Sequence, residues 1–224
     1  MKTFQIYQDL IKAGHILIGG STGSGKSTLI DALIYTACLG EGTAPTFYLI
    51  DPKRISLRKY RNMKIVAKRV TEMQDAIMLL QDVNKIMDDR YTRMEQADTD
   101  FCNERKIYVV IDEFADLVLN YGKQVTPLIQ RLAAMGRQCN ISVIMATQTV
   151  LASIVSTPIK NNFTATVALR TKLASQSRLI ADVAGAEKLP EHGYGLVSFP
   201  QTVRIYELPK IPDEDIEKLI KCCS

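Results

Sequence analysis

The sequence lacks any apolar run that approaches the roughly 18 residues of a membrane-spanning helix. Its first residues are not followed by the apolar core of a secretion signal either. These absences argue against an integral membrane segment and against export, so we expect a soluble, cytoplasmic protein. A membrane anchor, where one is used, would come from a partner domain or from another protein.

Cysteine is scarce, and the spacing of the cysteines suggests neither a disulfide scaffold nor a zinc site. Cys38, Cys102, Cys139, Cys222 and Cys223 are odd in number, and no two of them have the CxxC spacing of a zinc site. The sequence therefore predicts neither a disulfide scaffold nor a zinc site. A reducing cytosol fits this pattern.

The sequence also has no large excess of positive or negative charge. The formal net charge is +4, from 28 Lys and Arg against 24 Asp and Glu. This suits a polyanion as partner but does not identify one. With 46% hydrophobic residues, no internal repeat and no low-complexity tract, the composition is that of a globular protein. Two small domains would fit the length, but we expect residues 1–224 to form a single domain.

Short apolar runs rich in β-branched residues alternate with helical stretches. The expected strands are 15–19, 46–51, 65–70, 107–112, 142–147 and 164–170. This alternation predicts an α/β fold with a mostly parallel sheet flanked by helices. Thr71 is the expected N-cap of a long amphipathic helix. The runs 193–198 and 203–208 predict a C-terminal β-hairpin, and a short helix is expected over 213–222.

One glycine-rich run has the composition of a phosphate-binding loop. It comprises Gly20, Ser21, Thr22, Gly23, Ser24, Gly25, Lys26, Ser27 and Thr28. An apolar strand precedes it and an amphipathic helix follows it, which is the context that a P-loop (Walker A motif) requires. Small residues let backbone N–H groups converge on phosphates at the helix N-terminus, Lys26 reaches the β and γ phosphates, and the Ser27 hydroxyl is a ligand for Mg²⁺. We therefore predict ATP and Mg²⁺ as ligands.

A second motif supplies two carboxylates at the end of a fully apolar strand. The run 107–111 is followed by Asp112 and Glu113, and parallel sheets bind their ligands at the carboxyl ends of strands. This is a Walker B pattern, in which Asp112 helps to hold Mg²⁺ and Glu113 polarises the attacking water. Another apolar strand ends in Thr147-Gln148. Gln148 is a candidate γ-phosphate sensor, since an amide can donate to a phosphate oxygen and lose that contact on hydrolysis.

More specific strings of residues occur along the chain. They are Asp51-Pro52-Lys53, Thr71-Glu72-Met73, Asp88-Asp89-Arg90-Tyr91, Val110-Ile111-Asp112-Glu113-Phe114-Ala115-Asp116-Leu117, Arg131-Leu132-Ala133 before Gly136-Arg137, Ala146-Thr147-Gln148, Ile159-Lys160-Asn161-Asn162, Ser177-Arg178 and Ala184-Gly185-Ala186-Glu187. With the two nucleotide motifs, and over about residues 8–208, they resemble the motor domain of the FtsK/SpoIIIE DNA translocases, within the RecA-like and HerA-like P-loop ATPases. The likeness starts almost at the motor core, so the chain is either a compact free-standing motor or a fragment.

The resemblance implies a homo-hexameric ring that threads double-stranded DNA and hydrolyses ATP at sites between subunits. The biological role would be chromosome partition or the transfer of a mobile element. Arg137 stands where the family has its trans arginine finger. A guanidinium can stabilise the negative charge that spreads over the transferred phosphoryl group. A cap of the preceding helix is the alternative role for Arg137. Arg131 and Arg170 are the alternative fingers.

The loops that face the channel in this family match the segment after Gln148 and the segment 170–178. Lys172 and Arg178 are the candidate DNA phosphate contacts, since backbone contacts carry affinity without sequence information. Thr149 stands where the family usually has arginine, which weakens the expectation for the first loop. Related ring ATPases energise protein secretion, and a nucleotide switch without turnover is a third class. Glu113 and Arg137 argue against a switch, and salt-sensitive DNA binding discriminates the first two classes.

Overall fold

A computed structural model describes residues 4–40 and 42–224. Within these ranges, eight strands form one sheet in the order β3-β2-β4-β5-β1-β6-β7-β8. The strands are β1 (Ile16–Gly19), β2 (Thr46–Ile50), β3 (Val66–Val70), β4 (Ile107–Ile111), β5 (Ile141–Thr147), β6 (Ala165–Ala168), β7 (Tyr194–Phe199) and β8 (Thr202–Glu207). The strands from β3 to β6 are parallel, and β7 and β8 add an antiparallel hairpin at one end.

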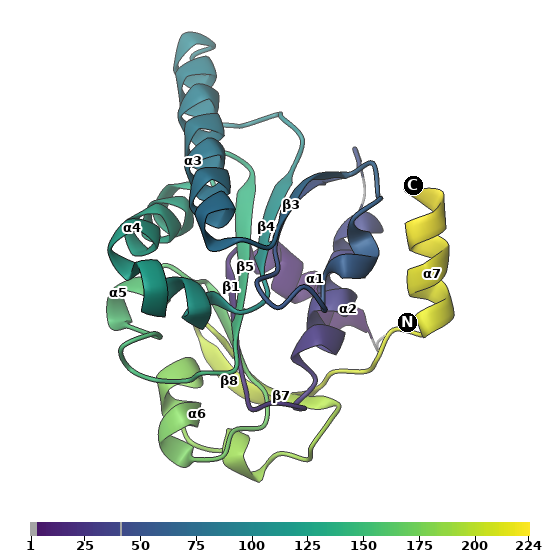
Figure 1. Cartoon of the computed structure of the whole chain (residues 1–224), viewed down its shortest axis with the longest axis vertical. Helices are drawn as coiled ribbons and strands as arrows, with labels where there is room; N and C mark the ends of the chain where they lie inside the picture. The colour runs from purple at the N-terminus through teal and green to yellow at the C-terminus, as the bar shows by residue number, and fades with distance from the viewer. Residues whose placement is uncertain (1–3, 41) are drawn as a thin grey trace.

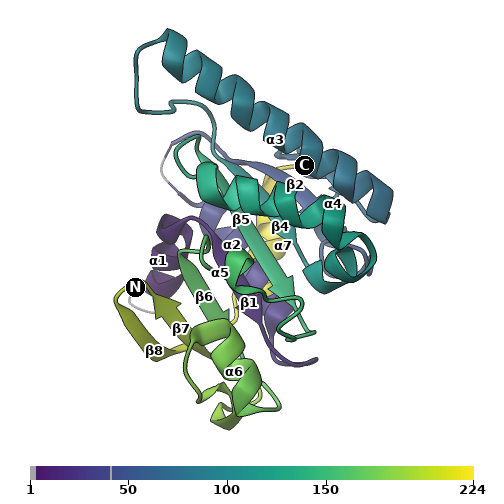
Figure 2. The same cartoon turned by 90° about the vertical axis from the view of Figure 1, so that its left-hand side faces the viewer.

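Helices cover both faces of this sheet (Figures 1 and 2). They are α1 (Gln5–Ala13), α2 (Lys26–Cys38), α3 (Met73–Gln96), α4 (Phe114–Met135), α5 (Thr157–Lys160), α6 (Ala174–Ala181) and α7 (Asp213–Cys222), with short 3-10 turns η2 (Arg58–Tyr60) and η3 (Ala186–Lys188). One apolar core lies under α3, α4 and α6, and the other lies under α1, α2 and α7. Successive strand residues such as Leu17 and Ile18 belong to opposite cores, as the two-residue period of a strand requires.

The predicted fold class is confirmed, and the six predicted strands lie within two residues of the observed bounds. The predicted C-terminal hairpin and the terminal helix are also present. The prediction that Thr71 caps the long helix is wrong. That helix begins at Met73, with Glu72 at the N-cap position, because its first backbone bond runs from Ala76 N to Glu72 O, 3.0 Å apart.

The strand order brings distant motifs to one edge. β1 lies between β5 and β6, and β4 lies between β2 and β5. Because these strands are parallel, the residues that follow β1, β4 and β5 all emerge at the carboxyl edge of the sheet. The glycine-rich loop, Asp112 with Glu113, and Gln148 therefore meet there. Among the described residues, no helix is both long and apolar enough to cross a membrane.

Candidate active site

The loop between β1 and α2 has the backbone that its glycines predict. Gly23 and Gly25 have positive φ angles of 78° and 95°, a region that strains other residues. At Gly20, a Cβ atom would lie 2.6 Å from Ser24 Oγ and 2.8 Å from Leu169 Cβ, so no larger residue fits without a shift. The loop leads directly into α2, which begins at Lys26. The N-terminus of this helix offers the backbone N–H groups that bind anions.

Lys26 lies inside this loop. Its side chain is buried, and Nζ donates to Gly20 O at 2.9 Å and to Ser21 O at 3.1 Å. Burial lowers the pKa of Lys26 to about 8, although the nearby carboxylates of Glu113 and Asp112 act in the opposite direction. The hydroxyl of Ser24 is buried and has no hydrogen-bond partner in the described part of the chain. A bound phosphate would supply partners to both groups, so the loop fits a nucleotide.

The metal prediction concerns Ser27 and Asp112. Ser27 Oγ lies 3.2 Å from Ser56 Oγ, in the loop that follows β2. Burial raises the pKa of Asp112, and the charges of Asp51 and Glu113 add to this effect. A divalent cation beside Asp112 would favour the ionised carboxylate and so oppose this rise in pKa. Hydroxyl and carboxylate oxygens are suitable ligands for Mg²⁺. Among the described residues, no group of three or more His, Cys, Asp or Glu side chains is arranged to hold a metal ion.

Glu113 is almost completely buried and accepts hydrogen bonds from three residues. Lys53 Nζ lies 3.1 Å from Oε2, and Thr147 Oγ1 lies 2.6 Å from Oε1. The backbone N–H of Gln148 lies 3.1 and 3.0 Å from the two carboxylate oxygens. These contacts fix the position of the carboxylate beside Asp112, at the place where the sequence predicts a water-polarising group.

Gln148 joins this carboxylate to the phosphate-binding loop. Its Oε1 atom accepts a hydrogen bond of 2.9 Å from Thr22 Oγ1, while its backbone N–H contacts Glu113. The side-chain amide nitrogen thus remains available to donate to a ligand. Movement of Gln148 would affect the loop, the carboxylate and β5 together. This geometry suits the predicted sensor.

Arg137 does not lie in this site. It is exposed in the turn between α4 and β5, at the opposite, amino-terminal edge of the sheet, and its Cδ approaches Gly14, which precedes β1. It can act on a nucleotide only from a neighbouring subunit. The two alternative fingers are already paired: Arg131 with Asp88 at 2.5 Å, and Arg170 with Glu191 at 3.2 Å.

The two predicted DNA contacts lie on either side of the start of α6. Lys172 lines a hollow of about 490 Å³ together with Arg170 and the loop 21–24. Its backbone N–H donates to Gln176 Oε1 at 3.0 Å. Arg178 is exposed on α6. Both cations therefore lie at the end of the molecule that carries the P-loop, with Lys172 next to the loop itself.

Sequence reasoning left the roles of Asp51 and Lys53 near the site open, and it missed Ser56. Lys53 belongs to the string Asp51-Pro52-Lys53, whose role was open, and it contacts Glu113. Asp51 is fully buried, and Oδ2 accepts hydrogen bonds from Arg69 Nη2 at 2.6 Å and from Leu57 N at 3.2 Å. This carboxylate therefore fixes the loop that carries Lys53. Ser56, which lies beside Ser27, had no distinguishing signal in the sequence.

An apolar hollow of about 300 Å³ adjoins the other side of the P-loop. The side chains of Leu29, Leu169 and Leu208 contribute to its wall, and Tyr194 lies at its edge with 38% of its surface exposed. Gly25 and Thr28 connect it to the loop. An apolar wall next to a phosphate-binding loop suits a flat, weakly polar group such as a nucleobase.

Known proteins resemble this chain in sequence. A model of the FtsK/SpoIIIE family matches residues 3–105 and 98–151. The protein "DNA translocase FtsK" of Chlorobaculum tepidum is 36% identical over 205 residues, which cover 82% of this chain and 26% of that protein. The chain thus spans about a quarter of the length of this curated relative.

Solved structures share the fold. The pCW3 conjugation coupling protein TcpA, in a monomer form with ATPγS, has a TM-score of 0.80 at 21% identity, over 95% of this chain and 65% of that chain. The cytoplasmic domain of the Type VII secretion ATPase EccC of Thermomonospora curvata has a TM-score of 0.78 at 18% identity, over 94% and 28%. On the extent of the family match and the identity to the relative, the chain belongs to the FtsK/SpoIIIE family.

Proposed function

We propose that this chain is an ATP-hydrolysing motor domain that moves double-stranded DNA as a hexameric ring, in chromosome partition or in mobile-element transfer. One observation carries the proposal: Lys26, Glu113 and Gln148 converge at one sheet edge and are linked by hydrogen bonds to each other or to the P-loop. The relative from Chlorobaculum tepidum carries the name DNA translocase. We extend that activity to this chain as one motor domain.

In the proposed reaction, Lys26 exchanges its two carbonyl partners for the β and γ phosphates. Glu113 orients and polarises the attacking water, and Gln148 donates to the γ-phosphate and reports its loss. Arg137 of the next subunit stabilises the charge that spreads over the transferred group. Lys26, Glu113 and Gln148 lie at the nucleotide site of the same chain. Arg137 is exposed at the opposite edge of the sheet and therefore requires a second copy of the chain.

Mg²⁺, when bound, would neutralise charge on the phosphates. Ser27 and Asp112 are the residues that would hold it, with Ser56 close to Ser27. Raising the Asp112 pKa by burial favours the neutral acid, so cation binding and ionisation of Asp112 are coupled in our proposal. The hollow bounded by Tyr194 and Leu208 would receive the nucleobase.

Duplex DNA is the proposed substrate, contacted through phosphates by Lys172 and Arg178. The test is the salt dependence of duplex DNA binding, because each lost phosphate contact lowers the slope of log K against log salt by about 0.9. Replacing Lys172 and Arg178 together by Ala should lower both affinity and slope. The matched control is Lys12→Ala with Arg204→Ala, two exposed cations on other elements. An unchanged slope in the Lys172 and Arg178 variant would remove these residues from the DNA interface.

A ring ATPase that energises protein secretion is the alternative. The fold similarity to EccC is compatible with it, but the identity is too low to carry function. A motor for protein cargo needs surfaces that bind peptides. Its cargo binding would not show the slope of log K against log salt that the number of DNA phosphate contacts sets. Weak, salt-insensitive DNA binding by the wild-type chain would favour this alternative.

A further inference from the structure

A basic surface lies beside the nucleotide site and has no role in the proposed reaction. Residues 53–69 include eight Lys and Arg but no Asp or Glu. Arg54, Arg58, Lys59 and Arg61 line a hollow of about 660 Å³ that reaches Ser27. We call these four residues the basic surface. Arg54 is paired with Glu72, and Lys59 with Asp31 at 2.5 Å.

Two cations of the basic surface have no carboxylate partner. Arg58 and Arg61 are exposed, and among the described residues no Asp or Glu lies within ion-pair distance of either. The same loop exposes Ile55, with 77% of its surface accessible. An exposed aliphatic side chain among uncompensated cations has the composition of an interaction surface.

An acidic surface occurs at the C-terminal end of α3 and on the loop between α3 and β4. Residues 95–104 include four Asp and Glu but no Lys or Arg. We call Glu95, Asp98, Asp100 and Glu104 the acidic surface. Glu104 is paired with Arg93 at 2.8 Å, whereas no ion pair involves the other three carboxylates in the part of the chain that the structure describes.

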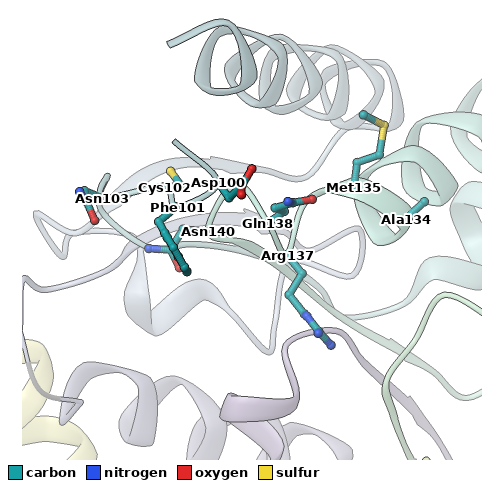
Figure 3. Close-up of a pocket in the computed structure, with 9 residues that line it drawn as sticks. All are labelled: Asp100, Phe101, Cys102, Asn103, Ala134, Met135, Arg137, Gln138 and Asn140. Carbon is teal, nitrogen blue, oxygen red and sulfur yellow. The ribbon is translucent and has the colours of Figure 1, made fainter. Parts of the chain in front are cut away.

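The acidic surface adjoins Arg137. Asp100, Phe101 and Arg137 line one hollow of about 640 Å³, and Figure 3 shows the two loops that carry them side by side. Phe101, like Ile55, has 77% of its surface exposed. The side that carries the arginine finger thus presents free carboxylates and an aromatic ring.

The two surfaces lie at opposite edges of the sheet. The basic surface shares a hollow with Ser27, at the carboxyl edge that carries the P-loop. The acidic loop precedes the amino end of β4, and β2 and β4 pair in parallel from Thr46↔Ile107 to Ile50↔Ile111. Five residues of strand span about 17 Å, which exceeds the Debye length of about 8 Å at physiological salt. The surfaces therefore do not neutralise each other within one chain.

We propose that the basic surface of one subunit docks on the acidic surface of the next subunit, with Ile55 against Phe101, and that this contact closes the ring head to tail. The inference rests on the proposed ring and names the residues that form its interface. Opposite charges at opposite edges suit a heterologous contact, which repeats from subunit to subunit. The same contact brings Arg137 to the side of the neighbour that carries Ser27.

Paired charge reversals test this interface. The first variant carries Arg58→Glu and Arg61→Glu, and the second carries Glu95→Lys and Asp100→Lys. Asp98 is left unchanged because its φ of 49° disfavours most other residues. Alone, each variant places like charges in every interface, so its assembly midpoint should rise about tenfold or more. Mixed in equal amounts, the two variants restore opposite charges at every interface of an alternating ring.

Assembly is measured by sedimentation with a non-hydrolysable ATP analogue, and ATP binding is measured on each variant. The control, Glu214→Lys with Glu217→Lys, reverses two exposed carboxylates on α7 and should assemble like the wild type. We expect weak assembly of each reversal, recovery in the mixture and unchanged ATP binding. Wild-type assembly that neither reversal affects, or a mixture that does not recover, would overturn the interface alone. A wild-type chain that binds ATP but never assembles would overturn both the interface and the proposed ring. Failure of the wild type to bind ATP would overturn the proposed function as well.

Discussion

Lys53 Nζ lies 3.1 Å from Glu113 Oε2, so a cation that follows β2 holds the carboxylate that follows the neighbouring strand β4. Lys53 is partly exposed, whereas the Glu113 side chain is only 2% exposed. The pair belongs to one network with Thr147 and Gln148. The position of the proposed base is thus set by three elements of the sheet edge.

Glu113→Gln should bind ATP with nearly unchanged affinity, but its turnover should fall by about a hundredfold or more, because an amide keeps the shape and lacks the basicity of a carboxylate. Separate measurement of the ATP dissociation constant and of kcat checks this result. Turnover at the wild-type rate would remove Glu113 from the role of base.

Lys53→Met should lower kcat by about tenfold, because the carboxylate loses the partner that orients it. Lys53→Arg should retain most of the activity, since it keeps a cation at that place. ATP affinity and melting temperature, measured in parallel, separate a positioning effect from partial unfolding. Equal kcat values for Lys53→Met and the wild type would show that this contact is dispensable.

Arg137→Ala should reduce turnover by about a thousandfold or more without loss of ATP binding, because the arginine acts from the neighbour. Mixing this variant with Lys26→Ala subunits creates interfaces at which Lys26 and Arg137 are both intact. Some activity should therefore return as the mixing ratio varies. Absence of recovery at every ratio would contradict a trans role and favour a local role at the end of α4.

The Tyr194→Ala variant tests the apolar hollow. Loss of a stacking surface should weaken ATP binding by about tenfold, while binding of inorganic triphosphate stays unchanged because it has no base. Val203→Ala, a similarly exposed residue of the same hairpin, is the matched control. Equal weakening of both ligands by Tyr194→Ala would contradict a base-binding role.

Folding stability should depend on His15 in acid. Its Nδ1 accepts a hydrogen bond of 3.1 Å from Val143 N, and burial, with smaller effects of Lys106 and Arg137, lowers its pKa to about 4. The unfolded chain therefore binds more protons than the folded chain between about pH 6.5 and 4. Stability should fall as pH drops through this window, by on the order of 3 kcal/mol.

Urea unfolding of the wild type and of His15→Gln at pH 7 and pH 4.5 measures this effect. Glutamine offers an acceptor that does not titrate, so the loss of stability between the two pH values should be smaller in the variant. His192→Gln, at the chain's other histidine, controls for the substitution itself. The same loss in His15→Gln and wild type would assign the acid sensitivity to other groups.

The fold and most of the nucleotide-site geometry were accessible from sequence because their signals are local. Apolar runs of five or so residues mark the strands, and the P-loop contains its own glycines, lysine and serine. The contact of Lys53 with Glu113 and that of Ser56 with Ser27 depend on strand order and loop path, which no local pattern encodes. The cap at Thr71 failed for a related reason: several polar residues can precede a helix, and backbone hydrogen bonding decides which one does.

The most direct test is ATP hydrolysis at high protein concentration, with and without long duplex DNA at low salt, and with Lys26→Ala as the blank. The account predicts hydrolysis by the wild type that DNA strongly stimulates, and background rates for the variant under both conditions. Hydrolysis that is indifferent to DNA, or wild-type rates no higher than those of Lys26→Ala, would contradict a DNA-driven motor.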